Sequence, residues 1–174
     1  VVNVENKDDV ALEAVKVVRN GEASILMKGI VNTSVYLRAV LNKEYGLRTG
    51  RLLSLLAVYE FPGYHKLIYC TDSGVNVSPD IEQKKDILTN SLIALKSMGL
   101  EMPKVAVLTS NEMVDPKIKS SVDAAMLVEM VEKNDIPSCI IEGPIAFDVA
   151  FDSGAAKHKG IDSKISGDVD LLMF

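Results

Sequence analysis

Four residues near position 30 have the types and spacing of a phosphate-binding turn. Lys28 and Gly29 interrupt a short apolar run, and Asn32 and Thr33 stand at the start of a segment with helical apolar spacing. A helix beginning here would present unpaired backbone N–H groups beside a fixed cation, which favours an anion. We therefore predict that this turn and helix start are suitable for phosphate, with Lys28 as the candidate cation.

Three arginines follow in the same part of the chain. Arg48 lies in a glycine-rich turn with Arg51 close behind, whereas Arg38 falls in the middle of the predicted helix. Arginine can form paired hydrogen bonds with phosphate oxygens. We predict that Arg48 contacts phosphate, and we interpret Arg38 as a solvated charge on the helix face.

Three polar residues come soon after apolar, strand-like runs. Asp72 and Asn76 share one loop, and Asp148 belongs to another. Ligands of open α/β sheets bind beyond the carboxyl ends of the strands, so we expect such loops to converge on one site. The Asx residues could also be turn formers, and Asp148 could be a helix cap. The four loops predicted to converge are 28–33, 72–78, 110–116 and 142–148.

The sequence does not support several other kinds of site. Two histidines, His65 and His158, and two cysteines, Cys70 and Cys139, lack the spacing of a zinc site. The dinucleotide fingerprint, the P-loop and the hydrolase nucleophile elbow are all absent. We expect no metal and no cofactor, and two buried free thiols in a reducing cytoplasm.

The charge and hydropathy of the chain argue against nucleic acids and membranes as partners. The net charge of −5 over 174 residues disfavours a general nucleic-acid binder, which would carry a basic face. No apolar run approaches the length of about 18–20 residues that spans a bilayer, and no signal peptide is visible. We expect a cytoplasmic protein without nucleic-acid or membrane partners. The apolar segments at both termini suggest a fragment of a longer chain.

Apolar periodicity predicts an alternation of strands and helices that would position these residues. The predicted strands are 24–27, 52–60, 66–71, 104–109, 138–141 and 169–174. The predicted helices are one capped by Asp8 or Asp9, 34–44 capped by Thr33 or Ser34, one from Ser78 to about Met98, one beginning near Ser120 or Ser121, and 146–157, which Gly154 breaks. Strands 52–60 and 66–71 would form an antiparallel hairpin. The remaining alternation indicates an α/β fold with a layered, mostly parallel sheet and crossover helices.

Six segments in order along the chain resemble the phosphate acetyl/butyryltransferase family, most closely its butyryl-transferring members. They read LMKGIVNTSVYLRAVLNKEYGLRTGRLLS, VYEFPGY, TDSGVNVSPDIEQK, PKVAVLTSNEMVDPK, EGPIAFDVA and HKGIDSKISGDVDLLM. The resemblance implies a fold similar to that of isocitrate/isopropylmalate dehydrogenase-type enzymes. It also implies that residues 1–23 are a remnant of an N-terminal domain or a linking helix. Residues 24–174 would then be a central acyltransferase domain, incomplete relative to the family.

The same resemblance implies an enzyme that exchanges a butyryl or other short acyl group between coenzyme A and phosphate. Coenzyme A would be a substrate, short-chain acyl-CoA and phosphate the small-molecule partners, and a homodimer the usual assembly. By position, the substrate-binding residues would be Lys28, Gly29, Asn32, Thr33, Arg48, Asp72, Asn76 and Asp148. The family's catalytic Ser-Arg and Asp segment has no counterpart here, so the catalytic residues stay unknown.

Two other functions remain open from the sequence. The first is a module that binds coenzyme A or a phosphorylated ligand without turnover. The second is an oxidoreductase of the dehydrogenase-like fold, although the sequence shows no aspartate cluster suited to a metal. Calorimetry with an acyl-transfer assay would separate the first from an enzyme, and a nicotinamide absorbance assay would test the second.

Overall fold

The computed structural model describes residues 1–6 and 9–174, which form two compact units, Val1–Arg51 and Leu52–Phe174. The first unit holds helices α1 (Val10–Arg19) and α2 (Thr33–Val40). This division differs from the predicted one after residue 23. The reason is a shared apolar core, in which Val15 of α1 packs with Ala39 of α2 and with Leu26 and Leu47.

Residues 24–27 do not form the predicted strand. Ile25 and Met27 are 84% and 88% exposed, and no described residue pairs with this segment as a strand. An extended segment without a neighbour leaves its backbone groups unpaired, so the apolar composition alone does not make a strand. The buried residues of α1 are Ala11 and Val15, because α2 packs on that side.

Both ends of α2 differ by a residue or more from the prediction, whereas the predicted Asp9 cap of α1 is confirmed. Asn32, not Thr33 or Ser34, caps α2, because its side-chain oxygen accepts a hydrogen bond from the Ser34 amide at 2.9 Å. Helix α2 ends at Val40, where an Asn42 turn replaces the expected helix to residue 44. Asp9 occupies the N-cap position of α1, and Asp8 lies outside the described residues.

The second unit is a mixed α/β layer structure. Its elements are β1 (Ala57–Tyr59), β2 (Ile68–Thr71), α3 (Ile81–Ser97), β3 (Lys104–Leu108), α4 (Lys119–Glu132), β4 (Ile140–Ile145), α5 (Phe147–Phe151), α6 (Ser153–His158) and β5 (Leu171–Met173). The strand order is β1-β2-β5-β3-β4, with β1 antiparallel to β2 and all other pairs parallel. The predicted hairpin and the mostly parallel sheet are therefore confirmed.

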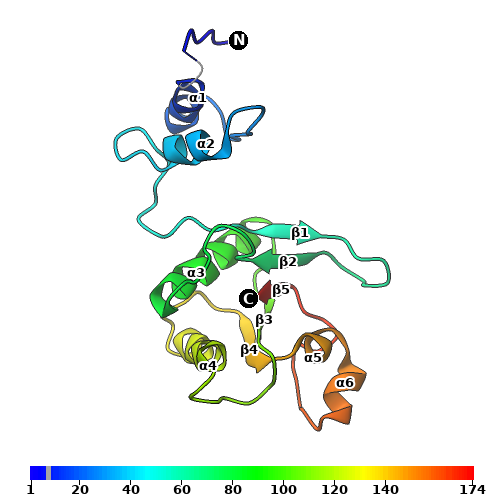
Figure 1. The fold of residues 1–174 in the computed structure, drawn as a ribbon. Coiled ribbons are helices and arrows are strands. Elements are labelled where there is room, and N and C mark those ends of the chain that lie inside the picture. Colours follow the sequence, from blue (N-terminus) through cyan, green and yellow to red (C-terminus); the bar gives the residue numbers. More distant parts are fainter. Residues whose placement is uncertain (7–8) are drawn as a thin grey trace. The chain divides into compact units, whose positions relative to one another are not determined.

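The two faces of this sheet are covered by different helices (Figure 1). Tyr69, Val105 and Leu171 belong to the core beneath α3 and α4, whereas their neighbours Cys70 and Leu172 belong to the core beneath α5 and α6. The chain proceeds from β2 to β4 by helices on one face. It then returns by α5 and α6 on the other face and inserts β5 at the centre, as right-handed crossovers require.

Strands β2, β3 and β5 are each shorter than the predicted 66–71, 104–109 and 169–174. Three further elements in this unit have boundaries that differ from the prediction. Strand β1 is shorter than 52–60, because side chains of α3 hold the preceding residues: Asp86 accepts from the Leu52 amide at 2.9 Å, and Asn90 donates to the Leu52 carbonyl at 2.7 Å. Strand β4 continues to Ile145, through the Glu142-Gly143-Pro144 turn with which the predicted loop 142–148 was expected to begin. The last helical stretch breaks at Asp152 rather than Gly154, and Asp152 caps α6 through the Gly154 amide.

The starts of α3 and α4 also differ from the prediction. Asp80, rather than Ser78, caps α3, and it forms a reciprocal capping box with Gln83. Helix α4 begins at Lys119, where the hydroxyl of Ser121 bonds back to the Ile118 carbonyl at 2.8 Å. The cap of α3 moved by two residues, and the cap of α4 moved by two or three.

An ionic network at the amino ends of the central strands holds β5 in place. Asp168 contacts Lys104 at 2.5 Å, Lys66 at 2.7 Å and His65 at 2.9 Å, and Asp170 contacts Lys66 at 2.7 Å. Hydrogen bonds from Lys104, Lys66 and His65 hold the pKa of Asp168 well below its usual range. These contacts join β5 to both of its neighbours, β2 and β3.

We expect that, in Asp168→Asn, the free energy of unfolding falls less between neutral and acidic pH than it does in the wild type. Because the folded-state pKa of Asp168 is depressed, its contribution is present above the unfolded pKa of about 4 and is lost as the pH falls below it. The side chain is 44% exposed, so solvent screening limits the effect to about 1 kcal/mol. Urea unfolding at pH 7 and pH 3 measures it, with Asp162→Asn, an exposed site, as control. An unchanged pH dependence would contradict the prediction.

Candidate functional site

The predicted phosphate turn lies at the amino end of α2. Lys28 donates to the carbonyl of Val31 at 3.0 Å and has no carboxylate partner within the described residues. Asn32 caps the helix, and Thr33 is its first residue. Gly29 is exposed, with open space around it. These four residues therefore lie around a solvent-accessible helix start, and their contact with phosphate stays a prediction.

Arg48 lies at the other end of the same helix. The amide of Leu47, its neighbour, bonds to the carbonyl of Val40, the last residue of α2, at 2.8 Å. Eight helical residues rise about 12 Å. The structure thus separates the backbone of Arg48 from the turn at Lys28.

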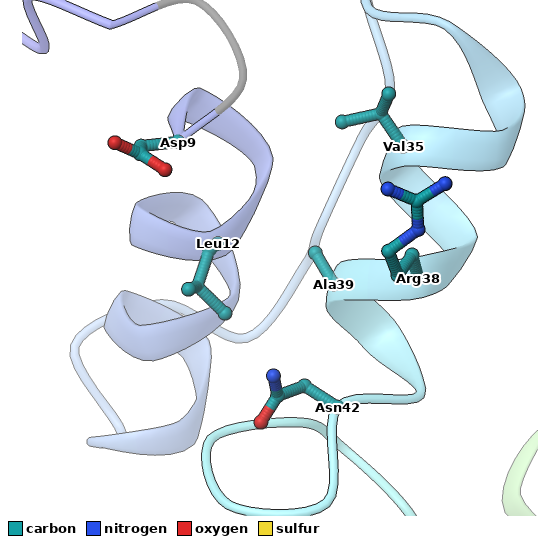
Figure 2. Close-up of a pocket in the computed structure, with 6 residues that line it drawn as sticks. All are labelled: Asp9, Leu12, Val35, Arg38, Ala39 and Asn42. Carbon is teal, nitrogen blue, oxygen red and sulfur yellow. The ribbon is translucent and has the colours of Figure 1, made fainter.

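Arg38 lines a pocket between α1 and α2 that the sequence interpretation missed. The pocket has a volume of about 310 Å³, and Figure 2 shows Leu12 from α1 and Asn42 beyond α2 facing one another across it. Arg38 and Asp9 give it one charge of each sign. Arg38 forms no ion pair within the part of the chain that the structure describes. The full lining is Asp9, Leu12, Val35, Arg38, Ala39 and Asn42.

The spacing of these residues could have indicated that they share one helix face, but not that α1 packs beside it to form a pocket. Val35, Arg38, Ala39 and Asn42 follow one another at i, i+3, i+4 and i+7, the pattern of a single helix face. Ala39 is the buried residue of α2, so Arg38 lies beside the face that packs on α1. From the sequence, Arg38 was interpreted as a solvent-facing charge because it is polar, although its position in the helix is next to the apolar face.

The first unit is also the electropositive part of an acidic chain. Residues 1–51 contain eight Lys or Arg and six Asp or Glu, for a net charge of +2, whereas the whole chain carries −5. The remaining residues therefore carry −7. An anionic ligand is attracted to the first unit and repelled by the average charge of the second.

Asp72 and Asn76 organise their own loop at the carboxyl end of β2. The Asp72 carboxylate accepts from the Val75 amide at 3.3 Å and also from the Asn76 side chain. Asn76 donates in turn to the Leu53 carbonyl at 3.0 Å. These contacts fit the turn-forming role that the sequence left open.

Asp148 is part of an ionic cluster at the carboxyl ends of β3 and β4. Lys159 contacts Asp148 at 3.1 Å and Glu112, from the loop after β3, at 2.8 Å. The hydrogen bond from Lys159 lowers the pKa of Asp148, and hydrogen bonds to Glu112 and then Asp148 raise the pKa of Lys159. The sequence interpretation missed both Glu112 and Lys159, because they approach one another only through the fold.

Three of the four predicted loops lie at one edge of the sheet. Residues 72–78, 110–116 and 146–148 follow parallel strands β2, β3 and β4, whose carboxyl ends point the same way. Asp72 and Asp148 are nonetheless separated by three strand spacings, about 14 Å. The loop 28–33 belongs to the other unit, so its convergence with these loops stays a prediction.

The described residues contain no cluster of three or more acidic, His or Cys side chains able to hold a metal ion. Cys70 and Cys139 are free and buried, and burial raises the pKa of the Cys139 thiol to about 12. Such a thiol is not a nucleophile at neutral pH. Among the helices of residues 1–6 and 9–174, none has the length and apolar character to cross a membrane.

Comparison with known proteins identifies the relatives of this chain. The family described as phosphate acetyl/butaryl transferase matches residues 2–174. A phosphate butyryltransferase of Clostridium acetobutylicum is 42% identical over 173 residues, 99% of this chain and 58% of the relative. A phosphate acetyltransferase of Thermotoga maritima is 39% identical over 160 residues, 92% of this chain and 54% of the relative.

Solved structures give the same relationship. A branched-chain phosphotransacylase from Enterococcus faecalis V583 matches with a TM-score of 0.88 and 34% identity, covering 99% of this chain and 61% of that one. The expected likeness to dehydrogenase-type folds stays a prediction, because this structure is a phosphotransacylase. The chain spans between half and two thirds of the length of these relatives. From the match over residues 2–174, we conclude that the chain belongs to the phosphate acetyl/butyryl transferase family.

Proposed function

We propose that the protein transfers a butyryl or other short acyl group between coenzyme A and inorganic phosphate, forming acyl phosphate and CoA. The observation that carries this proposal is the 42% identity with a phosphate butyryltransferase over 99% of the chain. Because the chain spans 58% of that relative, the activity is proposed for the whole protein. Coenzyme A is then a substrate, and the proposal includes no separate cofactor.

The reaction needs two anionic substrates in contact. An oxygen of hydrogen phosphate attacks the thioester carbonyl carbon and forms the C–O bond, which makes the carbonyl oxygen an oxyanion. When the carbonyl re-forms, the C–S bond breaks, and the proton lost by hydrogen phosphate ends on the departing CoA thiolate. Holding both substrates in a near-attack arrangement supplies at best about 7–11 kcal/mol. Hydrogen-bond donors aimed at the developing oxyanion add about 3–4 kcal/mol each. Because both substrates are anions, the site first requires cationic side chains in fixed positions that bind their phosphate groups.

The proposed substrate contacts divide between the two units. In the first unit, Lys28, Gly29, Asn32 and Thr33 would bind a phosphate at the start of α2, with Arg48 as a second cation. In the second unit, we assign Asp72, Asn76 and Asp148 to the loops that border the substrate. Asp72 and Asn76 would act by shaping their loop, since their polar atoms already bond within it.

We add Arg38 to this set, because it lines a pocket of the more basic unit. We further propose a cytoplasmic homodimer, as the sequence resemblance implies. Sedimentation of the purified protein tests the assembly, and cell fractionation tests the location.

A thiol-release assay tests the function directly. The purified protein is mixed with butyryl-CoA, with and without inorganic phosphate, and free CoA is followed with a thiol reagent. Phosphate-dependent release, together with butyryl phosphate as product, is the expected result. Binding of CoA by calorimetry without any release would instead support the binding module that the sequence left open.

We expect Arg38→Met to raise the Michaelis constant for butyryl-CoA or for phosphate about tenfold. A charge-assisted hydrogen bond is worth about 1.5–3 kcal/mol, and 1.4 kcal/mol corresponds to a factor of ten. Lys43→Met, which removes an exposed cation of the same unit, is the matched control and is expected to change neither constant. Unchanged kinetics in Arg38→Met would remove Arg38 from the site.

A further inference from the structure

The ends of β3 and β4 form the topological switch point of the described sheet. The chain leaves β3 toward α4 on one face and leaves β4 toward α5 on the other (Figure 1). In open α/β sheets, ligands bind where neighbouring strands connect to opposite faces. The cluster of Glu112, Asp148 and Lys159 lies at this point.

Lys159 connects three elements there. It follows α6 as its C-cap residue, and its ammonium contacts Glu112 of the loop 109–118 at 2.8 Å and Asp148 of α5 at 3.1 Å. Among the described residues, the other side-chain hydrogen bonds of this loop are local: Asn111 accepts from the Met113 amide at 3.2 Å, and Ser121 accepts from the Asp115 amide at 2.9 Å. The contact with Lys159 spans 47 residues and ties the loop to the opposite face of the sheet.

The charge of this cluster argues against a direct role of Lys159 in anion binding. One ammonium is shared by two carboxylates, so the three groups together carry a net negative charge. A phosphate would have to displace a carboxylate to reach Lys159. The side chain of Lys159 is 37% exposed, and exposed ion pairs contribute little to global stability. We therefore expect Lys159 to affect how well ordered the loop is, rather than the global stability.

We propose that Lys159 is a positioning residue that holds the loop 109–118 against the first turn of α5, so that the loop forms a fixed wall of the substrate site at the ends of β3 and β4. The inference rests on the acyl-transfer function proposed above. The exposed apolar side chains of Met113 and Phe147 stand on the two elements that Lys159 joins. Apolar side chains held in this way would contact the uncharged acyl chain of the substrate rather than its phosphate groups.

The test compares Lys159→Met, Lys159→Arg and Lys157→Met in the same protein. Lys157 is exposed, lies in the last turn of α6 and forms no ion pair in the described part of the chain, so it matches Lys159 in type and location. Hydrogen exchange of the amides at 110–114 and steady-state kinetics with butyryl-CoA are measured for each variant. Circular dichroism verifies that each variant is folded.

In Lys159→Met, we expect the loop amides to exchange at least fivefold faster and the Michaelis constant for butyryl-CoA to rise about fivefold, with turnover within twofold. Lys159→Arg is expected to restore both values, and Lys157→Met to leave them unchanged. Unchanged exchange or an unchanged Michaelis constant in Lys159→Met would overturn the proposal, as would equal changes in Lys157→Met. A wild-type protein without phosphate-dependent activity would refute the proposed function itself. An active wild-type protein with an unaffected Lys159→Met variant would refute only the role proposed for Lys159.

Discussion

Asp123→Ala is expected to lower the free energy of unfolding by about 3 kcal/mol. The Asp123 carboxylate, 6% exposed, contacts Lys84 of α3 at 2.8 Å and Lys119 of its own helix at 2.6 Å. Lys84 is only 14% exposed, so the variant leaves a largely buried ammonium without its carboxylate. Removing one partner of a buried pair costs about 3–5 kcal/mol, because the remaining charge is not solvated. Urea unfolding at pH 7 measures the loss.

Two further variants separate the buried contact from the exposed one. Lys119→Met removes the partner that is 69% exposed and is expected to cost less than about 1 kcal/mol. The double variant Asp123→Ala with Lys84→Met is expected to lose less than the sum of the single variants, because it leaves no buried charge. A loss below about 0.5 kcal/mol in Asp123→Ala would show that Lys84 is solvated without its partner.

The pKa of Asp123 agrees with this interpretation. Burial by itself would raise this pKa, but hydrogen bonds from Lys119 and Lys84 overcome that effect, and the pKa is lowered. The stabilisation is therefore present above the unfolded pKa of about 4 and is lost as the pH falls below it. The difference between wild type and Asp123→Ala should shrink accordingly in acid.

Gly143→Ala is expected to cost about 3 kcal/mol through overpacking. A Cβ atom at this position would lie 2.8 Å from the Cβ of Val107 and 3.3 Å from the Cβ of Ala124. Both neighbours are buried, and a Cβ atom cannot rotate away, so β4 must move relative to β3 and α4. Thermal and urea unfolding measure the cost.

Gly74→Ala is the matched control for Gly143→Ala. Its added Cβ would meet only the flexible end of Leu55, at 3.7 Å. We expect a change within about 0.5 kcal/mol, as for surface substitutions in general. Equal stability losses in the two variants would contradict the steric explanation and point to a general effect of replacing glycine.

Gly143 also explains why one turn was predicted wrongly. Glycine followed by proline commonly marks a turn, and the sequence was interpreted so at 142–144. Here the glycine is required because β4 approaches Val107 and Ala124 too closely for a side chain. The same residue type serves a loop or a crowded strand, and only the neighbours distinguish the two uses.

The sequence alone was enough to predict the elements whose formation depends on residues close together in the chain. Helix α3, the hairpin of β1 and β2, and the parallel strands β3 and β4 follow from periodicity and turn residues, and all were predicted. The family was also readable from six ordered segments, and the match over residues 2–174 confirms it. These properties depend on residues near one another in the chain, which a sequence displays directly.

Only the tertiary structure decided where distant residues meet. Residues 24–27 have a strand-like composition but no pairing partner in the described structure, and Arg38 gained a pocket because α1 packs beside it. The cluster of Glu112, Asp148 and Lys159 exists because the chain crosses to the opposite face of the sheet after β4. Contacts of this kind depend on topology and burial, which no local pattern of residue types encodes.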